Sequence, residues 1–306
     1  MQSAHIPFCT RYLNQHASKP VFELLNEVGL LNNEKFPNSS VLNALAQRFY
    51  GKWCGPAFKD QSTFDADEGR YYETIISEDN TVPTREESWH DLFNALVWLQ
   101  FPKTKKYLNT LHVKDIVSYG ANPRTERRNR ITHFDECGIV LAVEIPAPSF
   151  KNDQKNQKQS ATYIDNKLNA VGVAQWLNAL ANHQWHDVFI QSRSVWHNQV
   201  TPFIFGHANL EMMLSPFIGL TGKWLAVPVA QGFSELDKWE QRQVLDEAML
   251  ARLNELNDFN SAPLLKPLPL LGVPGWHNDQ TPAFYANKDY FRPIRANAKP
   301  TIQLPL

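Results

Sequence analysis

Hydrophobic positions between residues 85 and 100 recur with a helical period, in the segment REESWHDLFNALVWLQ. At about 100° per residue, six large apolar side chains cover one broad face of such a helix. They are Trp89, Leu92, Phe93, Leu96, Val97 and Leu99. Thr84 and Glu87 have the spacing of a capping box, so we expect the helix to begin at about Arg85.

The rest of the pattern predicts a mixture of helices and short strands. Helical spacing is found at about 38–50, 103–112, 163–184, 206–214 and 235–256. Extended segments are expected at about 69–85, 188–196 and 223–229. Two β-rich runs within 130–144 flank an acidic turn with Asp135 and Glu136 that closes at Gly138, which predicts a β-hairpin.

The chain ends in an apolar, proline-rich segment, 261–295. Its prolines oppose regular structure while its leucines and aromatic residues demand burial, so we expect it to wrap over the body. The polar tract 151–160 predicts a surface loop at which the chain could be subdivided. Because helices and strands do not alternate as βαβ units, we predict one large α+β domain over 1–306 with mainly antiparallel strands.

Composition and charge narrow the classes of partner. The 306 residues are 43% hydrophobic and 20% charged, with a net charge of −1, so no global field attracts nucleic acid or anionic lipid. Three cysteines without a CxxC pair do not form a zinc ribbon or a disulfide framework. No signal sequence or long apolar run is present, so we expect a soluble, cytoplasmic protein; its oligomeric state is left open.

Four side chains of the central helix fall together on the stripe opposite its apolar face: His90, Asp91, Asn94 and Trp98. In one interpretation they line a cleft, with His90 as a base or metal ligand and Trp98 as an apolar wall. In the other, the carboxylate is favoured by the helix dipole and Asn94 satisfies the backbone of a loop. Both interpretations remain open.

An arginine run lies just before the acidic pair Asp135 and Glu136. Arg127, Arg128 and Arg130 could bind a phosphate or carboxylate by forked hydrogen bonds. The alternative is a solvated loop in which these arginines pair with neighbouring acids. Asp135 could likewise do no more than cap its own turn.

His207 and Glu211 lie at i and i+4 in the segment GHANLE. From one helical face they could reach one ion or share one proton, although the HExxH motif is absent. If they converged with His90, Asp91 and Asp135, the mixed nitrogen and oxygen donors would suit zinc, manganese or iron. The chain has no GxGxxG, GxxxxGK[ST] or GxSxG motif, which argues against dinucleotide, P-loop and α/β-hydrolase chemistry.

Four motifs, WHDLFNALVW, THFDECG, FGHANLE and PLPLLGVPGW, occur in an order that resembles an uncharacterised bacterial family, domain of unknown function number three-zero-two-five. The resemblance covers about residues 70–295 and implies no activity. It does place a set of residues at motif positions: Trp89, His90, Asp91, Asn94, Asp135, Glu136, Gly206, His207, Glu211, Pro274, Gly275 and Trp276.

The hypothesis that follows is a hydrolase that acts on a small anionic substrate, with a divalent metal as its expected cofactor. His90, Asp91, Asn94, Asp135 and Glu136 would form its cleft, with His207 and Glu211 as a further pair. A non-catalytic protein that holds a ligand beside Trp276 and the Pro-rich tail is an alternative. A weaker one is an HNH-like nuclease built on His90, Asn94, Asn109 and His112, although the spacing departs from that pattern.

Overall fold

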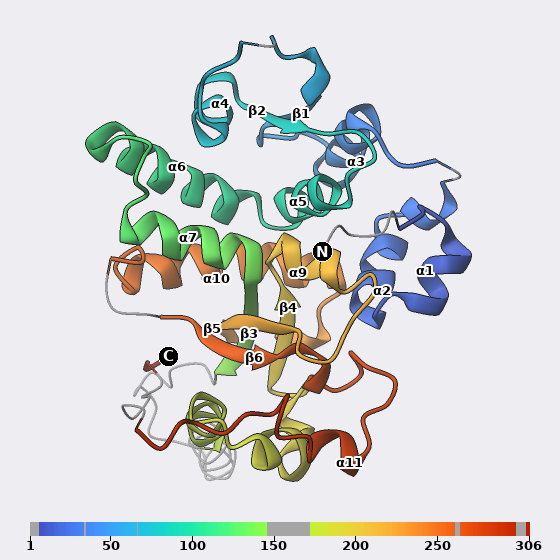
Figure 1. The fold of residues 1–306 in the computed structure, drawn as a ribbon, viewed down its shortest axis with the longest axis vertical. Helices are drawn as coiled ribbons and strands as arrows, with labels where there is room; N and C mark the ends of the chain where they lie inside the picture. The colour runs from blue at the N-terminus through green and yellow to red at the C-terminus, as the bar shows by residue number, and fades with distance from the viewer. Residues whose placement is uncertain (1–5, 34, 66, 146–171, 261–263, 298–303) are drawn as a thin grey trace, which may run out of the picture.

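The computed structural model describes residues 6–33, 35–65, 67–145, 172–260, 264–297 and 304–306 (Figure 1). The polar tract 151–160, and with it the predicted subdivision, lies outside these residues. So does the first part of the helix predicted from 163. The described remainder of that helix runs over 172–181.

The N-terminal part of the chain is helical. Its helices are α1 (Thr10–His16), α2 (Lys19–Glu27), the short η1 (Leu30–Asn32) and α3 (Ser39–Tyr50). The last confirms the helix predicted at about 38–50, and Asn38 caps it by accepting from the amide of Val41. The next elements are β1 (Ala57–Asp60), η2 (Gln61–Thr63), α4 (Tyr72–Asp79) and β2 (Thr81–Thr84).

The extended segment predicted at 69–85 is therefore wrong over most of its length. Only β2 is a strand, and α4 occupies the part before it. Ile75 and Ile76 are buried side by side on α4, which a period-two pattern does not explain. The helix ends at Asn80, whose φ of 49° reverses the chain into β2.

The central helix α5 spans Trp89–Gln100 and begins four residues later than predicted. Ser88 is its N-cap and accepts from the amide of Asp91 at 3.3 Å. Thr84 instead ends strand β2, and Glu87 has a φ of 52°, outside the right-handed helical region. The sharp turn between β2 and α5 thus replaces the expected capping box.

Helix α6 (Pro102–Tyr119) follows at once and is a full two turns longer than the predicted 103–112. Its N-terminus is capped from another helix, α10 (Lys238–Glu255). The carboxylate of Asp246 on α10 accepts from the amides of Lys103 and Thr104, both at 2.8 Å. This long-range cap ties the two helices together.

Replacing Asp246 by alanine should lower the free energy of unfolding by about 2 kcal/mol, because two amides at the start of α6 lose their acceptor. The measurement is urea denaturation followed by circular dichroism. Glu247→Ala is the matched control, since Glu247 reaches the ammonium of the same Lys103 at the surface. Equal stability of the two variants would contradict the capping role.

The hairpin predicted at 130–144 is replaced by helix α7 (Glu126–Cys137), which runs directly into strand β3 (Gly138–Ile145). Thr125 caps α7, and Ile131 and Phe134 are buried at helical spacing. Asp135 and Glu136 therefore lie in the last turn of a helix, immediately before a buried strand.

The main sheet has the order β4-β3-β5-β6. Besides β3, it contains β4 (Val200–Ile204), β5 (Thr221–Ala230) and β6 (Lys266–Pro269). The β3–β4 and β5–β6 pairs are antiparallel, whereas β3–β5 and the separate β1–β2 pair are parallel. The α+β class is confirmed, with more parallel pairing than expected. Helices α7, α9 and α10 lie over one face of the sheet (Figure 1).

Between residues 182 and 214 short helical elements lie on both sides of strand β4. A π-helix, η3 (Asp187–Gln191), and a 3-10 turn, η4 (Arg193–Val195), replace the extended segment predicted at 188–196. Val188 and Phe189 are both fully buried there, so adjacent side chains do not alternate between two faces. Helix α9 (His207–Met212) confirms the helix predicted at 206–214, and η5 (Phe233–Glu235) precedes α10.

The proline-rich ending does wrap over the body, but it is more regular than predicted. It contributes β6, η6 (Leu270–Gly272) and α11 (Pro282–Tyr285). Two prolines are tolerated in β6 because it is an edge strand. Its apolar side chains are buried, among them Leu268, Leu270, Leu271, Trp276, Tyr285 and Phe291.

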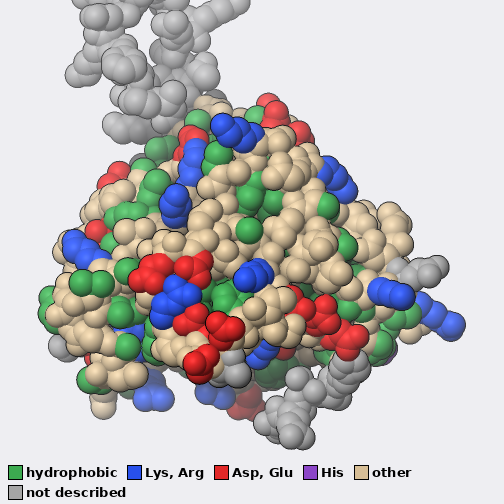
Figure 2. Space-filling model, turned by 90° about the horizontal axis from the view of Figure 1, so that it is seen from above, with side chains coloured by type: hydrophobic (Ala, Val, Ile, Leu, Met, Phe, Trp, Pro, Cys, Tyr) green, Lys and Arg blue, Asp and Glu red, His purple; other side chains and the backbone are tan. Residues whose placement is uncertain are grey.

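The surface seen from above in Figure 2 mixes acidic and basic side chains without a continuous patch of one sign. One surface network joins Arg70 to Glu68, Glu78 and Asp79. Among the described helices, none is long and apolar enough to cross a bilayer.

Candidate metal centre

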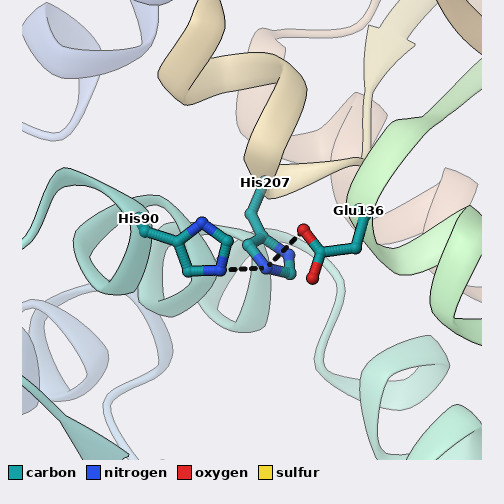
Figure 3. A group of neighbouring side chains, drawn as sticks. All are labelled: His90, Glu136 and His207. Carbon is teal, nitrogen blue, oxygen red and sulfur yellow. Dashed lines mark hydrogen bonds and ion pairs between the residues drawn. The ribbon is translucent and has the colours of Figure 1, made fainter. Parts of the chain in front are cut away.

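Three side chains from three different helices converge on one point (Figure 3). Nε2 of His207 lies 3.1 Å from Nε2 of His90 and 3.3 Å from Oε2 of Glu136. All three offered ligand atoms lie within 4.8 Å of one another. Two ligands of a tetrahedral zinc ion, each about 2.1 Å from the metal, would lie about 3.4 Å apart. The two spacings at His207 therefore fit a single ion, and the ligand atoms of His90 and Glu136 lie within 4.8 Å of each other.

The strand pair β3–β4 brings Glu136 and His207 together. Glu136 precedes β3, His207 follows β4, and the register pairs Ile139 with Ile204. The amides of Phe205 and Gly206 both donate to the carbonyl of Gly138, at 3.0 and 2.8 Å. The start of α9 is thereby attached to the end of α7.

Gly206 is required at this junction. A Cβ atom there would lie 2.4 Å from the carbonyl oxygen of Glu136 and 2.5 Å from the amide nitrogen of Gly138. Asn209, fully buried one turn into α9, adds a bond from its side chain to the carbonyl of Cys137 at 2.9 Å. The two helices therefore meet through backbone contact.

His90 reaches the cluster from the first turn of α5 and is held from both sides. Its Nδ1 lies 3.0 Å from Oε2 of Glu211, while its Nε2 faces His207. The predicted pair His207 and Glu211 therefore contacts both ring nitrogens of His90 from one face of α9. The hydrogen bond to Glu211 is the main cause that raises the pKa of His90.

His207 is almost completely buried, and burial lowers its pKa to about 4. Its Nδ1 lies 3.9 Å from Oδ2 of Asp135 and has no hydrogen-bond partner among the described residues. Without an ion, a protonated His90 can donate to the neutral His207 across the 3.1 Å contact. With an ion, both Nε2 atoms are free to act as ligands.

Asp135 lies behind His207 and is held by Lys105 of α6. The Lys105 ammonium lies 2.5 Å from Oδ1 of Asp135 and 2.9 Å from Oδ1 of Asn94. Burial opposes the charge on Asp135, but the nearby Lys105 and His207 outweigh it and hold the pKa of Asp135 below its usual value. Each histidine presents Nε2 to the centre. His90 has the carboxylate of Glu211 within hydrogen-bond distance of Nδ1, as in carboxylate–histidine–metal triads, whereas Asp135 lies 3.9 Å from Nδ1 of His207.

Glu136 differs from Asp135 in having no neighbouring ammonium bonded to it. Burial raises the pKa of Glu136, and the adjacent Asp135 and Glu211 add to this effect. A raised carboxyl pKa means that the carboxylate is poorly stabilised. A cation bound between it and the two imidazole nitrogens would stabilise its charge. Burial and Glu136 also raise the pKa of the Cys137 thiol, which disfavours the nucleophilic thiolate.

The other members of the predicted α5 stripe have separate contacts. Asp91 binds Arg85 through the guanidinium, at 2.7 and 3.0 Å, and through its backbone amide. Asn94 lies between Lys105 and the hydroxyl of Tyr72, to which its Nδ2 donates at 2.8 Å. Trp98 is 2% exposed, and the ammonium of Lys105 lies 5.5 Å from the centre of its ring. Trp98 therefore packs beneath Lys105 in the core and does not line an open cleft.

The arginine run lies at the opposite end of α7. Arg127 pairs with Asp115, and Arg128 is fully buried and donates to the carbonyl of Ala121. Arg130 donates to the carbonyls of Phe259 and Asn260. Nine residues of helix separate Arg127 from Glu136, roughly 13 Å along the axis. The structure does not bring the run to the histidines.

Trp276 is also apart from the histidine cluster. It lines a cavity of about 110 Å³ beside β4, together with Thr201, Phe203 and Arg242. The HNH-like alternative loses its basis, because the strand before α5 pairs in parallel with β1 instead of forming a hairpin. Asn109 and His112 of α6 are buried against Glu73 of α4.

Two residues near the site, Lys105 and Tyr72, do not stand out in the sequence. Lys105 lies in a helix that also carries Leu108 and Leu111, but this pattern does not distinguish a buried lysine from a surface lysine. Tyr72 was assigned to a strand. Only the packing of α4 against α6, and of α6 against α5, shows that both reach the stripe.

The fold and the cluster define an α+β protein with a two-histidine, one-glutamate group at the meeting point of three helices. The family described as "Protein of unknown function (DUF3025)" matches residues 57–167 and 144–295, more than half of the chain, so the chain belongs to this family. No curated protein and no solved structure matches it.

Proposed function

We propose that this protein is a metal-dependent hydrolase whose divalent ion is held by His90, His207 and Glu136. The observation that carries the proposal is the convergence of two Nε2 atoms and one carboxylate oxygen within 4.8 Å. Two histidines and one glutamate leave coordination positions open for water and substrate, as in catalytic zinc sites. Zinc, manganese and iron all accept such a donor set.

The charge around the cluster supports the same proposal. Four carboxylates lie on this side of α5, namely Asp91, Asp135, Glu136 and Glu211, against the two cations Arg85 and Lys105. A divalent ion would balance the remaining negative charge. It would also offset the burial, and the repulsion by Asp135 and Glu211, that raise the pKa of Glu136.

In hydrolysis, the oxygen of a water molecule bonds to the attacked carbonyl or phosphoryl centre, and the leaving group takes up a proton. The ion would supply Lewis-acid chemistry and activate the water. Glu211 is suited to accept the proton that the water loses, because its side chain is one-third exposed and its Oε1 bonds to none of the described residues. We expect a small anionic substrate, because a bound divalent ion would neutralise the acidic site and attract an anionic oxygen.

Elemental mass spectrometry of the tag-free protein, purified without chelator, tests the metal site. We expect close to one zinc, manganese or iron ion per chain, removal by EDTA, and recovery on addition of the same ion. Chromogenic carboxylic and phosphoric esters then test hydrolysis with the loaded and the EDTA-treated protein. A protein that neither retains nor takes up any of the three ions would contradict the proposal.

A further inference from the structure

The hydroxyl of Tyr72 is bound to the α5 stripe by a chain of hydrogen bonds that begins at Lys105. Lys105 fixes which group donates and which accepts at each step of the chain. Lys105 has only donors, so the oxygen of Asn94 must face it, at 2.9 Å. The amide nitrogen of Asn94 must then face Tyr72, to which it donates at 2.8 Å. Tyr72 is therefore the acceptor, and its own proton is left over.

That proton has no acceptor among the described residues, in which the hydroxyl makes the single bond with Asn94. Tyr72 as a whole residue is 39% exposed, although its hydroxyl lies where burial disfavours the phenolate. Burial of the hydroxyl and the neighbouring Asp135 raise the pKa of Tyr72, so that the phenol keeps its proton at neutral pH. A neutral phenol with a free proton is a ready hydrogen-bond donor.

The partner of the phenol lies on the same helix as one of the proposed metal ligands. Asn94, which holds the phenol, is one helical turn from His90 on the same stripe of α5. The ammonium that orients Asn94 also binds Asp135, the neighbour of Glu136. The chain Tyr72–Asn94–Lys105–Asp135 thus ends at the carboxylate behind His207.

A fixed cation is bound to the same stripe. Asp91, next to His90, binds Nε and Nη2 of Arg85, at 3.0 and 2.7 Å. Nη1 of Arg85 donates to no residue in the described part of the chain, and the side chain is 58% exposed. The hydrogen bond to Asp91 is the main cause that raises the pKa of Arg85, and the charges of Glu211 and Tyr72 act in the same direction.

We infer that Tyr72 is a substrate-binding residue that donates its free proton to an anionic oxygen of the substrate at the metal centre, with Lys105 and Asn94 as positioning residues. The inference rests on the proposed function and deepens it, since it assigns the substrate class as a small carboxylate or phosphate. Arg85 provides the second, cationic contact for the same group.

The test uses the full-length, zinc-loaded protein and two probes, inorganic phosphate and acetate, with affinities from titration calorimetry. Tyr72→Phe should weaken the binding of at least one probe about tenfold, the loss of one hydrogen bond to a charged group. Its zinc affinity should stay within about twofold of the wild-type value. Tyr119→Phe, at a tyrosine that is 70% exposed on α6, is the control and should change neither.

Asn94→Asp tests the polarity of the chain without changing its shape. The new carboxylate can only accept, so the Tyr72 proton turns toward it and is no longer free. Asn94→Asp should therefore weaken anion binding in the wild type more than it does in the Tyr72→Phe background, where only its added charge acts. Equal effects in the two backgrounds would overturn the positioning role of Asn94.

The outcomes separate this inference from the proposed function. Zinc binding with unchanged phosphate and acetate affinities in Tyr72→Phe would overturn the inference and leave the metal site standing. Zinc binding by a wild-type protein that binds neither probe would do the same. If the wild type takes up no zinc, manganese or iron, the proposed function fails and the inference falls with it.

Discussion

Replacing His207 by alanine is expected to weaken zinc binding by more than about a hundredfold, the largest functional effect that we foresee in this chain. His207 offers the one ligand atom that lies within 3.3 Å of both others. Its removal leaves His90 and Glu136 on separate helices without the group between them. His90→Ala should have an effect of similar size, because it removes the second nitrogen.

A graded series distinguishes lost ligands from general destabilisation. Glu211→Gln, which removes a carboxylate beside His90 but no proposed ligand, should weaken zinc binding only about tenfold. His186→Ala is the control, since that histidine is exposed and distant from the cluster in sequence. Zinc titration of each EDTA-treated variant gives the affinities, and thermal denaturation shows whether it is folded. Equal affinities for His207→Ala and His186→Ala in folded proteins would exclude the centre.

Lys105→Met is expected to lower the free energy of unfolding by about 3 kcal/mol, the largest effect on stability among our predictions. The ammonium is 6% exposed and satisfies two oxygens at once, one on Asp135 and one on Asn94. Without it, the carboxylate of Asp135 remains three-quarters buried without its cation, and methionine fills the space but donates no hydrogen bond.

Two further variants make this prediction specific. Lys106→Met, at the exposed neighbouring lysine, should change stability by less than about 0.5 kcal/mol. Lys105→Met combined with Asp135→Asn should recover part of the loss, because the unpaired charge is then absent. Urea denaturation of the four proteins gives the free energies. A double variant no more stable than Lys105→Met would mean that packing, and not charge, explains the loss.

The sequence predicted the stripe of the central helix because its members lie within one element. His90, Asp91 and Asn94 recur at helical spacing, and that spacing alone places them on one side. The boundary was wrong because Thr84 and Ser88 are both good caps. A backbone turn at Glu87, with positive φ, decides between them.

The element that carries Asp135 and Glu136 was misassigned for a related reason. The β-rich run after Gly138 is strong, and short alternating runs before it resemble a partner strand. Helix α7 prevails because Ile131 and Phe134 are buried by packing against other elements, as in the stacked pair of Phe134 and Phe205. The importance of the acidic pair was nevertheless recognisable from its place before a buried strand.

The contacts between residues of different elements could not be predicted from the local sequence pattern. That Glu136 and not Asp91 joins the two histidines depends on the register of β3 with β4. That Lys105 binds Asp135 depends on how α6 lies against α7. Such contacts follow from tertiary packing, which overrides what any single segment prefers.

Gly206 has a consequence for the thermodynamics of ion uptake. Because a hydrogen atom in place of a methyl group lets α9 rest directly on the end of α7, the backbones that carry His207 and Glu136 are held together by main-chain contact. The backbone of this part of the cluster is therefore preorganised, and an arriving ion would order side chains alone. The backbone conformational entropy that a flexible site loses on metal binding is here lost earlier, when the chain folds.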